Sequence, residues 1–578
     1  MRTSDARLRT LAPLAALTVA SMALLTATSG TLAAWTDDEY VSAAAGVMVA
    51  GDCTTTTLFQ TESAGRQLSG SLGGAELDTL AAVQGVQVGN ANGTVTVAPG
   101  TATQVDPVTH TSALEAGALG MPLLSTAVGL NQPAGNAGAY TQWAQAKASG
   151  QAAGAAGLVS DQSGAIDGTG TAAGSTTAPT AASVNLESFV PSSEVAVTLD
   201  VGAVASSAAV DACTLTNGWP TLDPSPAVDR RYGIAGLGLN LSAGLIHTMT
   251  GSVSGTIDRV SQELAAAATT GSLRAAVKAG VTDLVSQSSD ELAAGSVTTE
   301  ITFGAPNLSA ARQLLTTPLT DGVVSIDLVN ATISFDLAKL AYGSAGLNGL
   351  PANTRVAFGA GAVQNLTQRT SALLEAWGEA ISAEIEKALA ATSFTMDTTV
   401  VLQADDPLLG KIDVTEVSLG YATTVGAFLP QTPPAPLPAP TVSTKVLGLG
   451  LPGLEALLEP ITAALASGTG EIVAGAFDDT LFGPGALVPM TAAAIQSAVL
   501  PVVDAADSAL SPLADTLTLT VNVQPDQPGA PVSAAVAGNA ADGQYKVSAL
   551  RIAAVGSTAE LYLATAAAGP VVFQRGAG

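Results

Sequence analysis

The chain has 578 residues, which is enough for several hydrophobic cores, and 47% of them are hydrophobic, so a wholly disordered protein is excluded. Only 12% of the residues are charged and 4% are aromatic, so the cores must be built mainly from small aliphatic side chains. The formal net charge of −27 at pH 7 makes nucleic acids and anionic membranes poor partners.

Residues 1–34 have the order of features that is typical of an export signal. Basic residues precede a short apolar run, and small residues follow it, so we predict cleavage beside Ala33, Ala34 or Trp35. The alternative is a buried N-terminal helix. No later segment reaches eighteen uninterrupted apolar residues, so we expect no membrane span in the mature chain. The basic residues are Arg2, Arg7 and Arg9.

Cys53 and Cys213 are the only cysteines in the sequence. In an exported chain an even and sparse cysteine count predicts one disulfide, because oxidising compartments favour pairing. The alternative is two buried free thiols.

The N-terminal part of the mature chain has the pattern of short strands. Residues 35–130 form an expected β-rich region, in which Asn92-Gly93 between alternating valines predicts a hairpin. Residues 131–182 are rich in Ala, Gly, Ser and Thr, which is typical of a surface excursion or a flexible linker.

A helix followed by strands is predicted three times, starting near residues 273, 366 and 491. The first two units fall in a central α+β region at 183–429, and the third falls in a C-terminal α+β module at 442–578. Residues 430–441 are proline-rich and predict a stiff linker between them. We therefore expect an α+β, β-rich fold of several antiparallel-sheet modules with packed amphipathic helices.

Four segments resemble the choice-of-anchor G family, whose members are exported surface proteins of high-GC Gram-positive bacteria, the actinobacteria. The cleavage region at 33–39 resembles that of biofilm-matrix proteins of the camelysin type. The resemblance implies a secreted, surface-associated protein and brings no catalytic residue. The chain departs from the family pattern at its end, where we find no sorting motif, so we expect release or retention through other proteins. The four segments are Gly65–Asp78, Val197–Ser206, Gly346–Thr354 and Ala559–Pro570.

The two histidines, His110 and His247, do not form a catalytic set in the sequence. His110 has a loop-like surface context and His247 lies in an apolar run, so each is expected to be structural or exposed. Two histidines and two paired cysteines leave no ordinary zinc site. We predict no catalytic residue and no cofactor.

Gly448–Gly453 fits the dinucleotide fingerprint, with Glu471 near the expected acidic position. Pro452 removes a backbone donor that a phosphate would need, and a turn before a helix explains the pattern equally well.

Three acidic pairs are either solvated charges or ligands for a calcium ion, and the sequence leaves metal binding open. The pairs are Asp37-Asp38, Asp405-Asp406 and Asp478-Asp479.

From these observations we expect an exported, non-enzymatic surface or matrix protein with an adhesion, spacer or assembly role. Its partners would be components of the cell envelope or matrix, and the sequence indicates no oligomeric state. The alternative is a secreted module that binds or hydrolyses envelope glycans through acidic residues.

Overall fold

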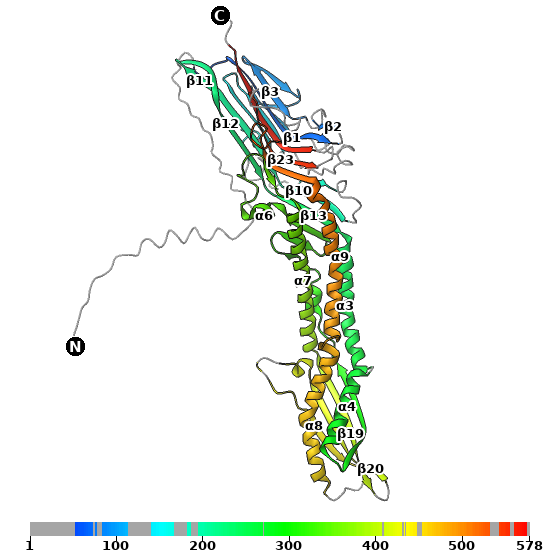
Figure 1. The fold of residues 1–578 in the computed structure, drawn as a ribbon. Helices are drawn as coiled ribbons and strands as arrows, with labels where there is room; N and C mark the ends of the chain where they lie inside the picture. Colours follow the sequence, from blue (N-terminus) through cyan, green and yellow to red (C-terminus); the bar gives the residue numbers. More distant parts are fainter. Residues whose placement is uncertain are drawn as a thin grey trace, which may run out of the picture.

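The computed structural model describes an elongated molecule with a β-rich head above a long stalk (Figure 1). All strand pairs in the described residues are antiparallel, and they form four sheets beside long helices, which confirms the expected α+β, β-rich fold. The description covers residues 52–574 except 73–74, 78–83, 114–139, 167–181, 187–194, 270, 407–409, 431–432, 434, 448–452, 532–542 and 555–559.

The first sheet of the head, here the terminal sheet, joins the two ends of the chain. Its central pair is β1 with β24, in which Phe59 lies opposite Phe573. The N-terminal region and the C-terminal module expected from the sequence therefore share one sheet. Its strands in order are β18 (Thr354–Val356), β22 (Leu517–Val523), β23 (Tyr545–Ala554), β24 (Glu560–Phe573), β1 (Phe59–Leu72), β3 (Val86–Ala91) and β4 (Thr94–Ala98), with β2 (Ala75–Glu76) beside β1.

The hairpin predicted at Asn92-Gly93 is confirmed. These two residues connect β3 to β4 and have φ angles of 52° and 87°, the left-handed conformation that a tight hairpin turn requires.

The second sheet, here the alanine-rich sheet, contains part of the segment that was expected to be a surface excursion or linker. Residues 141–157 instead contribute two neighbouring strands with mostly buried side chains, so that expectation was wrong for them. The strands in order are β12 (Trp219–Ile234), β11 (Val204–Thr216), β8 (Gln151–Gly157), β7 (Thr141–Ala146), β6 (Thr109–Ala113) and β5 (Thr103–Asp106).

Small residues allow the terminal and alanine-rich sheets to approach closely. A Cβ atom added to Gly154 would lie 2.2 Å from the carbonyl oxygen of Ala64 and 2.5 Å from that of Ala567. Stacked sheets usually lie about 10 Å apart, and backbone contact of this kind is possible only between glycine and alanine faces. This packing explains how a head with few aromatic residues can have a core.

The third sheet, here the neck sheet, continues the alanine-rich sheet toward the stalk. The long strand pairs bend at Gly202 and Gly236, where the Gly202 amide donates to the Gly236 carbonyl at 2.9 Å. The neck strands in order are β15 (Leu319–Thr320), β16 (Val324–Asp327), β17 (Thr332–Asp336), β13 (Leu237–Ala243), β10 (Val195–Val201) and β9 (Ala182–Asn185).

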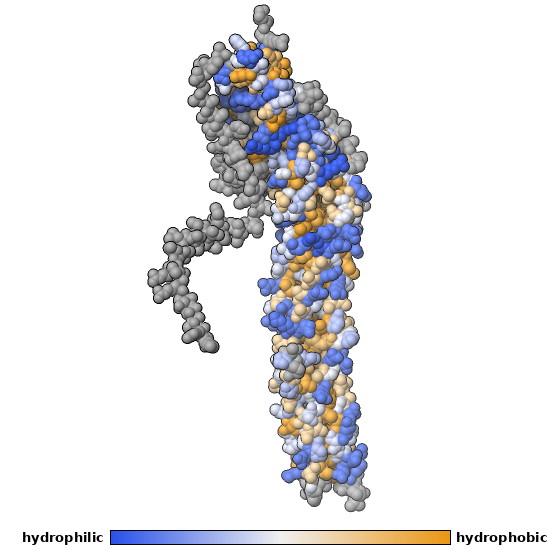
Figure 2. Space-filling model, turned by 60° about the vertical axis from the view of Figure 1, so that its left-hand side comes forward, coloured by the Kyte–Doolittle hydropathy of each residue, from blue (hydrophilic) through white to orange (hydrophobic). Residues whose placement is uncertain are grey.

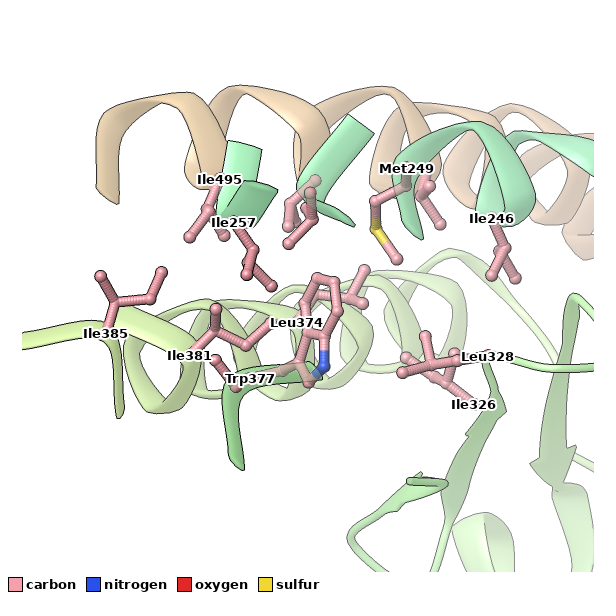
Figure 3. Packing of buried hydrophobic residues seen from close by; sticks show 14 of the residues in the cluster. Ile246, Met249, Ile257, Ile326, Leu328, Leu374, Trp377, Ile381, Ile385 and Ile495 are labelled. Carbon is pink, nitrogen blue, oxygen red and sulfur yellow. The ribbon is translucent and has the colours of Figure 1, made fainter. Parts of the chain in front are cut away.

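The upper stalk is formed by three long helices, α3, α7 and α9, whose apolar faces meet along the axis (Figure 1). Trp377 lies at their centre between residues of α3 and α7 (Figure 3), and its Nε1 donates to the Leu314 carbonyl at 2.9 Å. The helices are α3 (Gly244–Thr269), α4 (Ser272–Ser288), α5 (Ser309–Gln313), α6 (Leu337–Tyr342), α7 (Ala360–Ala390), α8 (Leu454–Phe477) and α9 (Leu487–Thr516), with short turns η4 (Gly343–Ala345), η5 (Val425–Phe428) and η6 (Asp478–Phe482).

The lower stalk is a fourth sheet, here the stalk sheet, with α4 and α8 beside it (Figure 1). Five aromatic rings meet where the lower and upper stalk join. The strands are β14 (Leu292–Phe303), β19 (Ser393–Asp406), β20 (Gly410–Thr424) and β21 (Thr441–Val446). The rings are those of Phe303, Phe394, Tyr421, Phe428 and Phe477.

The stalk sheet corrects two expectations about domain organisation. β14 and β19 come from the two units expected in the central region, yet they pair directly, so these units are not separate modules. The proline-rich residues 430–440 connect β20 to its neighbour β21. They therefore form a connection within one sheet and do not separate two domains.

One stretch of the described residues, Leu454–Thr516, is long and apolar enough to cross a membrane. It consists of α8, η6 and α9, which pack along α4, α7 and α3 in the stalk. The surface of the stalk mixes hydrophobic and hydrophilic residues along its length (Figure 2). The stretch is thus explained as stalk helices and does not establish a span.

Candidate binding trough at the neck

A trough of about 2410 Å³ lies where the head meets the stalk. One part is lined by the outer face of the alanine-rich sheet, and the other by the polar face of the neck sheet. The bend at Gly202 and Gly236 lies between these two parts, and both glycines line the trough.

The neck sheet has one apolar face and one polar face because its strands alternate strictly. Leu199, Leu239 and Phe335 are almost fully buried on the face that packs toward the helices. The residues between them point to the opposite face, where they line the trough.

A row of short, uncharged side chains crosses the polar face of the neck sheet. Asn240 lies opposite Ser334, Ser334 opposite Ser325, and Ser325 opposite Thr320. We call these four residues the neutral row. All four line the trough.

A second row places two carboxylates on either side of a glycine. Gly238 is paired with Asp200 on one side and with Asp336 on the other. Since neighbouring strands lie about 4.8 Å apart, the two aspartates are roughly 10 Å apart. The missing side chain at Gly238 leaves the space between them open, with the Asp200 Cβ 3.9 Å from a Cβ placed there.

The two carboxylates have different surroundings. Asp200 accepts a hydrogen bond from the Asn240 amide, but partial burial raises its pKa above the usual 3.8. Asp336 caps α6 by accepting from the Lys339 backbone amide at 2.9 Å, and the Lys339 ammonium lies 3.2 Å away.

Every basic side chain that lines the trough has a polar partner. Arg230 forms a bidentate ion pair with Asp526. Arg231 contacts Asp229 at 3.0 Å, and Lys147 donates to Gln151 at 3.2 Å. The lining contains four basic and four acidic residues, so its formal charge is balanced in a chain of net charge −27. These residues are Lys147, Arg230, Arg231, Lys339, Asp200, Asp211, Asp229 and Asp336.

Three aromatic residues line the trough: Trp143, Tyr232 and Phe335. Trp143 is only 4% exposed, and its Nε1 has no hydrogen-bond partner among the described residues. The Tyr232 hydroxyl donates to the Leu347 carbonyl at 2.7 Å and accepts from the Leu350 amide at 2.9 Å. Burial raises the pKa of Tyr232 to about 12.

The segment Gly346–Thr354, one of those that carried the family resemblance, fastens the wall of the trough to the terminal sheet. The Asn348 side chain accepts a hydrogen bond from the Ile234 amide and donates one to the Ile234 carbonyl. Asn353 donates to the Gln524 carbonyl at 2.9 Å and accepts from its amide at the same distance. The role of this segment is therefore visible as a structural clamp.

No residue of the neutral row or of the aspartate pair was predicted from the sequence to belong to a functional site. Each belongs to a strand in which buried aliphatic residues alternate with polar ones, as at 195–201, 237–243 and 332–336. That alternation could have indicated a polar sheet face, but only the strand register brings the side chains together.

The two histidines lie on different elements and do not share a site. His110 was expected in a surface loop, but it lies in β6, is 8% exposed, and its Nδ1 has no partner among the described residues. That expectation was wrong because β6 is paired on both sides. His247 is exposed on α3.

The predicted disulfide is confirmed: Cys53 and Cys213 are bonded, with their Cα atoms 5.8 Å apart. It ties the chain just before β1 to the end of β11. The predicted cleavage residues Ala33, Ala34 and Trp35 lie outside the described residues.

The structure does not support a dinucleotide site at 448–453. Residues 448–452 lie outside the described part, but β21 before them belongs to an antiparallel sheet, whereas the fingerprint needs a parallel β-α-β unit. Glu471 is exposed on α8.

The acidic pairs do not gather with other ligands. Asp478 and Asp479 are exposed in η6, and Asp405 is exposed at the end of β19. Across the described residues no group of three or more His, Cys, Asp or Glu side chains is placed to hold a metal ion. The pair Asp37-Asp38 lies outside the description.

A family described as Domain of unknown function (DUF8394) matches residues 63–569. The match extends from within β1 to the end region of β24, and thus includes both head and stalk. No curated protein and no solved structure matches the chain.

Proposed function

The chain belongs to the family Domain of unknown function (DUF8394), and we propose that it is an exported, non-enzymatic cell-surface or extracellular-matrix protein. In this proposal the stalk is a spacer, and the head is the part that contacts envelope or matrix components. The observation that carries the proposal is the separation of a compact head from a long stalk (Figure 1).

The length of the stalk supports a spacer role. α7 alone has 31 residues, which corresponds to about 46 Å at 1.5 Å per residue. The lower stalk adds the 15-residue strand β20 and the 24-residue helix α8 below the upper stalk. A shape of this kind is suited to holding a binding head away from an attachment point.

Two features support export, and two more support an acidic protein at the cell surface. The N-terminal 34 residues have the composition of a signal peptide, and the two cysteines form a disulfide. The resemblance of four segments to the choice-of-anchor G family adds the surface location, and the low charge density fits an extracellular acidic spacer.

Fractionation of the native host, followed by N-terminal sequencing, tests this proposal. We expect a chain that starts at Ala34 or Trp35 in the wall or matrix fraction. The same chain found only in the medium would contradict the surface location, and an uncleaved cytosolic chain would contradict export itself.

A second candidate function is the binding or hydrolysis of envelope glycans through acidic residues. The pair Asp200 and Asp336 favours it, because their separation of roughly 10 Å across Gly238 is close to the range of about 6.5–9.5 Å between the two carboxyl groups of inverting glycosidases. Asp200 is partly buried and its pKa is raised, while Asp336 pairs with the Lys339 ammonium and caps the start of α6. Release of reducing ends from host wall polysaccharide, abolished by Asp200→Asn, would establish hydrolysis; no release would reject it.

A further inference from the structure

We propose that the trough at the neck binds an extended, uncharged polysaccharide chain across the neutral row and the aspartate pair. This inference rests on the proposed surface role of the head and names the chemical class of its ligand. It concerns recognition and requires no bond to be broken.

The size of the trough indicates a chain of several units. Pockets for small molecules usually have volumes of about 300–1,000 Å³. The trough has about 2410 Å³ and runs over two sheet faces. A ligand that fills it is therefore a polymer segment or a comparably long molecule.

The floor of the trough has the chemistry that sugar hydroxyl groups need. Hydroxyl groups both donate and accept, and the amide of Asn240 and the hydroxyls of Ser334 and Ser325 do the same. Asp200 and Asp336 add acceptors at the two edges, and the open space over Gly238 lets a ring approach the sheet.

Charge argues for an uncharged ligand. A polyanion would meet a strongly acidic chain whose trough cations already contact Asp526, Asp229, Asp336 and Gln151. A polycation would find a lining whose formal charges balance. Neither kind of polymer gains a net charge attraction from the lining.

Geometry argues against a peptide. Extended peptides are usually bound by adding a strand to a free sheet edge, where backbone groups are available. The floor is a sheet face, and its central strand β13 is already paired with β10 and β17 on both sides. A peptide backbone that lies across β13 on this floor would therefore find side chains and no free backbone groups.

An independent observation lies in the other part of the trough. Trp143 lines it with a buried indole whose Nε1 has no partner among the described residues. Buried polar groups normally have a hydrogen-bond partner, so an orphaned donor in a cavity wall indicates a missing acceptor. A sugar oxygen that reaches this part of the wall can supply one.

Isothermal titration calorimetry of the purified secreted chain tests the proposal with three neutral hexasaccharides: cellohexaose, maltohexaose and chitohexaose. We expect at least one to bind with a dissociation constant of 1 mM or tighter, on the order of −4 kcal/mol. Binding by none of the three overturns the proposal. The proposal is also overturned if the chain binds an oligolysine or oligoglutamate decapeptide and none of the three hexasaccharides.

Two matched variants locate the site. Ser334→Trp fills the floor of the trough, whereas Thr332→Trp places the same side chain on the same face of β17 outside the lining. We expect the first to weaken binding at least tenfold and the second to leave it within twofold. Equal effects of both variants would overturn the placement.

A second pair of variants with smaller changes tests the site even if the tryptophan variants misfold. Asn240→Ala removes a floor amide, and Ser242→Ala changes the next residue on the same face of β13, which is exposed and outside the lining. We expect a several-fold loss of affinity only for Asn240→Ala. The proposed function is tested by fractionation and N-terminal sequencing of the unaltered chain, which does not use these variants, so this inference and the proposed function can fail separately.

Discussion

Phe59 and Phe573 pack edge to face with their ring centroids 5.2 Å apart, although they lie at opposite ends of the described chain. Their strands β1 and β24 form the centre of the terminal sheet. The head therefore cannot be completed before the last strand is available, and the stalk lies between its two halves in the sequence.

Replacing Phe59 by Ala should destabilise the head by about 3–5 kcal/mol, because the side chain is fully buried. Val572→Ala is the control, since this neighbouring side chain is 49% exposed. Thermal unfolding followed by circular dichroism measures both. Similar midpoints for the two variants would show that the contact of the chain ends contributes little.

Gly154→Ala should destabilise the head by about 3 kcal/mol or more, because its Cβ would overlap the Ala64 and Ala567 carbonyl oxygens. The control is Gly255→Ala in α3, where no heavy atom lies within 4 Å of the added methyl group. That change should stabilise the chain by about 0.5–1 kcal/mol. Denaturant titration distinguishes the two signs; a neutral Gly154→Ala would refute the close sheet contact.

Two tyrosines should respond oppositely to the same change. The buried Tyr421 hydroxyl has no hydrogen-bond partner among the described residues, and burial raises its pKa to about 12. Tyr421→Phe should therefore stabilise the chain by about 1 kcal/mol. Tyr232→Phe should cost about 1–2 kcal/mol, because it removes the bonds to Leu347 and Leu350. Urea titration of both variants checks this, and equal signs would contradict it.

The Arg230–Asp526 pair should make the head sensitive to acid. Burial alone would raise the pKa of Asp526, but hydrogen bonds from Arg230 and Gln527 and the charge of Arg230 outweigh it and lower the pKa below 3.8. Because the folded-state pKa is the lower one, the pair stabilises the chain above about pH 4, and this stability is lost as the pH falls through the folded-state pKa.

Asp526→Asn should accordingly cost about 3 kcal/mol at pH 7 and much less near pH 2, as measured by melting temperatures across this range. The control Asp258→Asn breaks a pair with Arg312 whose side chains are more than half exposed, so it should change stability by less than about 0.5 kcal/mol. A cost for Asp526→Asn that does not depend on pH would contradict the assignment.

Features with local causes were predictable from the sequence. The turn at Asn92-Gly93 could be predicted because its left-handed backbone favours these residue types. The helix at 360–390 and the strand after it could also be predicted, because apolar residues recur with the helical period in the first and alternate with polar residues in the second. The disulfide followed from cysteine count and compartment.

Features with long-range causes were not predictable. Nothing near Phe59 indicates that its partner strand is the last one, and the alternation of β14 does not name β19 as its neighbour. The alanine and glycine residues of β8 resembled a linker, because close sheet packing needs small residues just as a linker tolerates them. The trough needed the register of β10, β13 and β17, which no single strand encodes.

Two helices of the stalk continue into strands of the head without an intervening loop: α3 begins at Gly244 directly after β13, and β22 begins at Leu517 directly after α9. Mechanical tension on the stalk would thus reach the head along the strand axes. β13 is hydrogen-bonded to both of its neighbours, so the load would act in shear on two ladders at once. Shear requires many hydrogen bonds to break together, whereas peeling breaks them one by one. The junction is built to transmit force to the trough without a hinge.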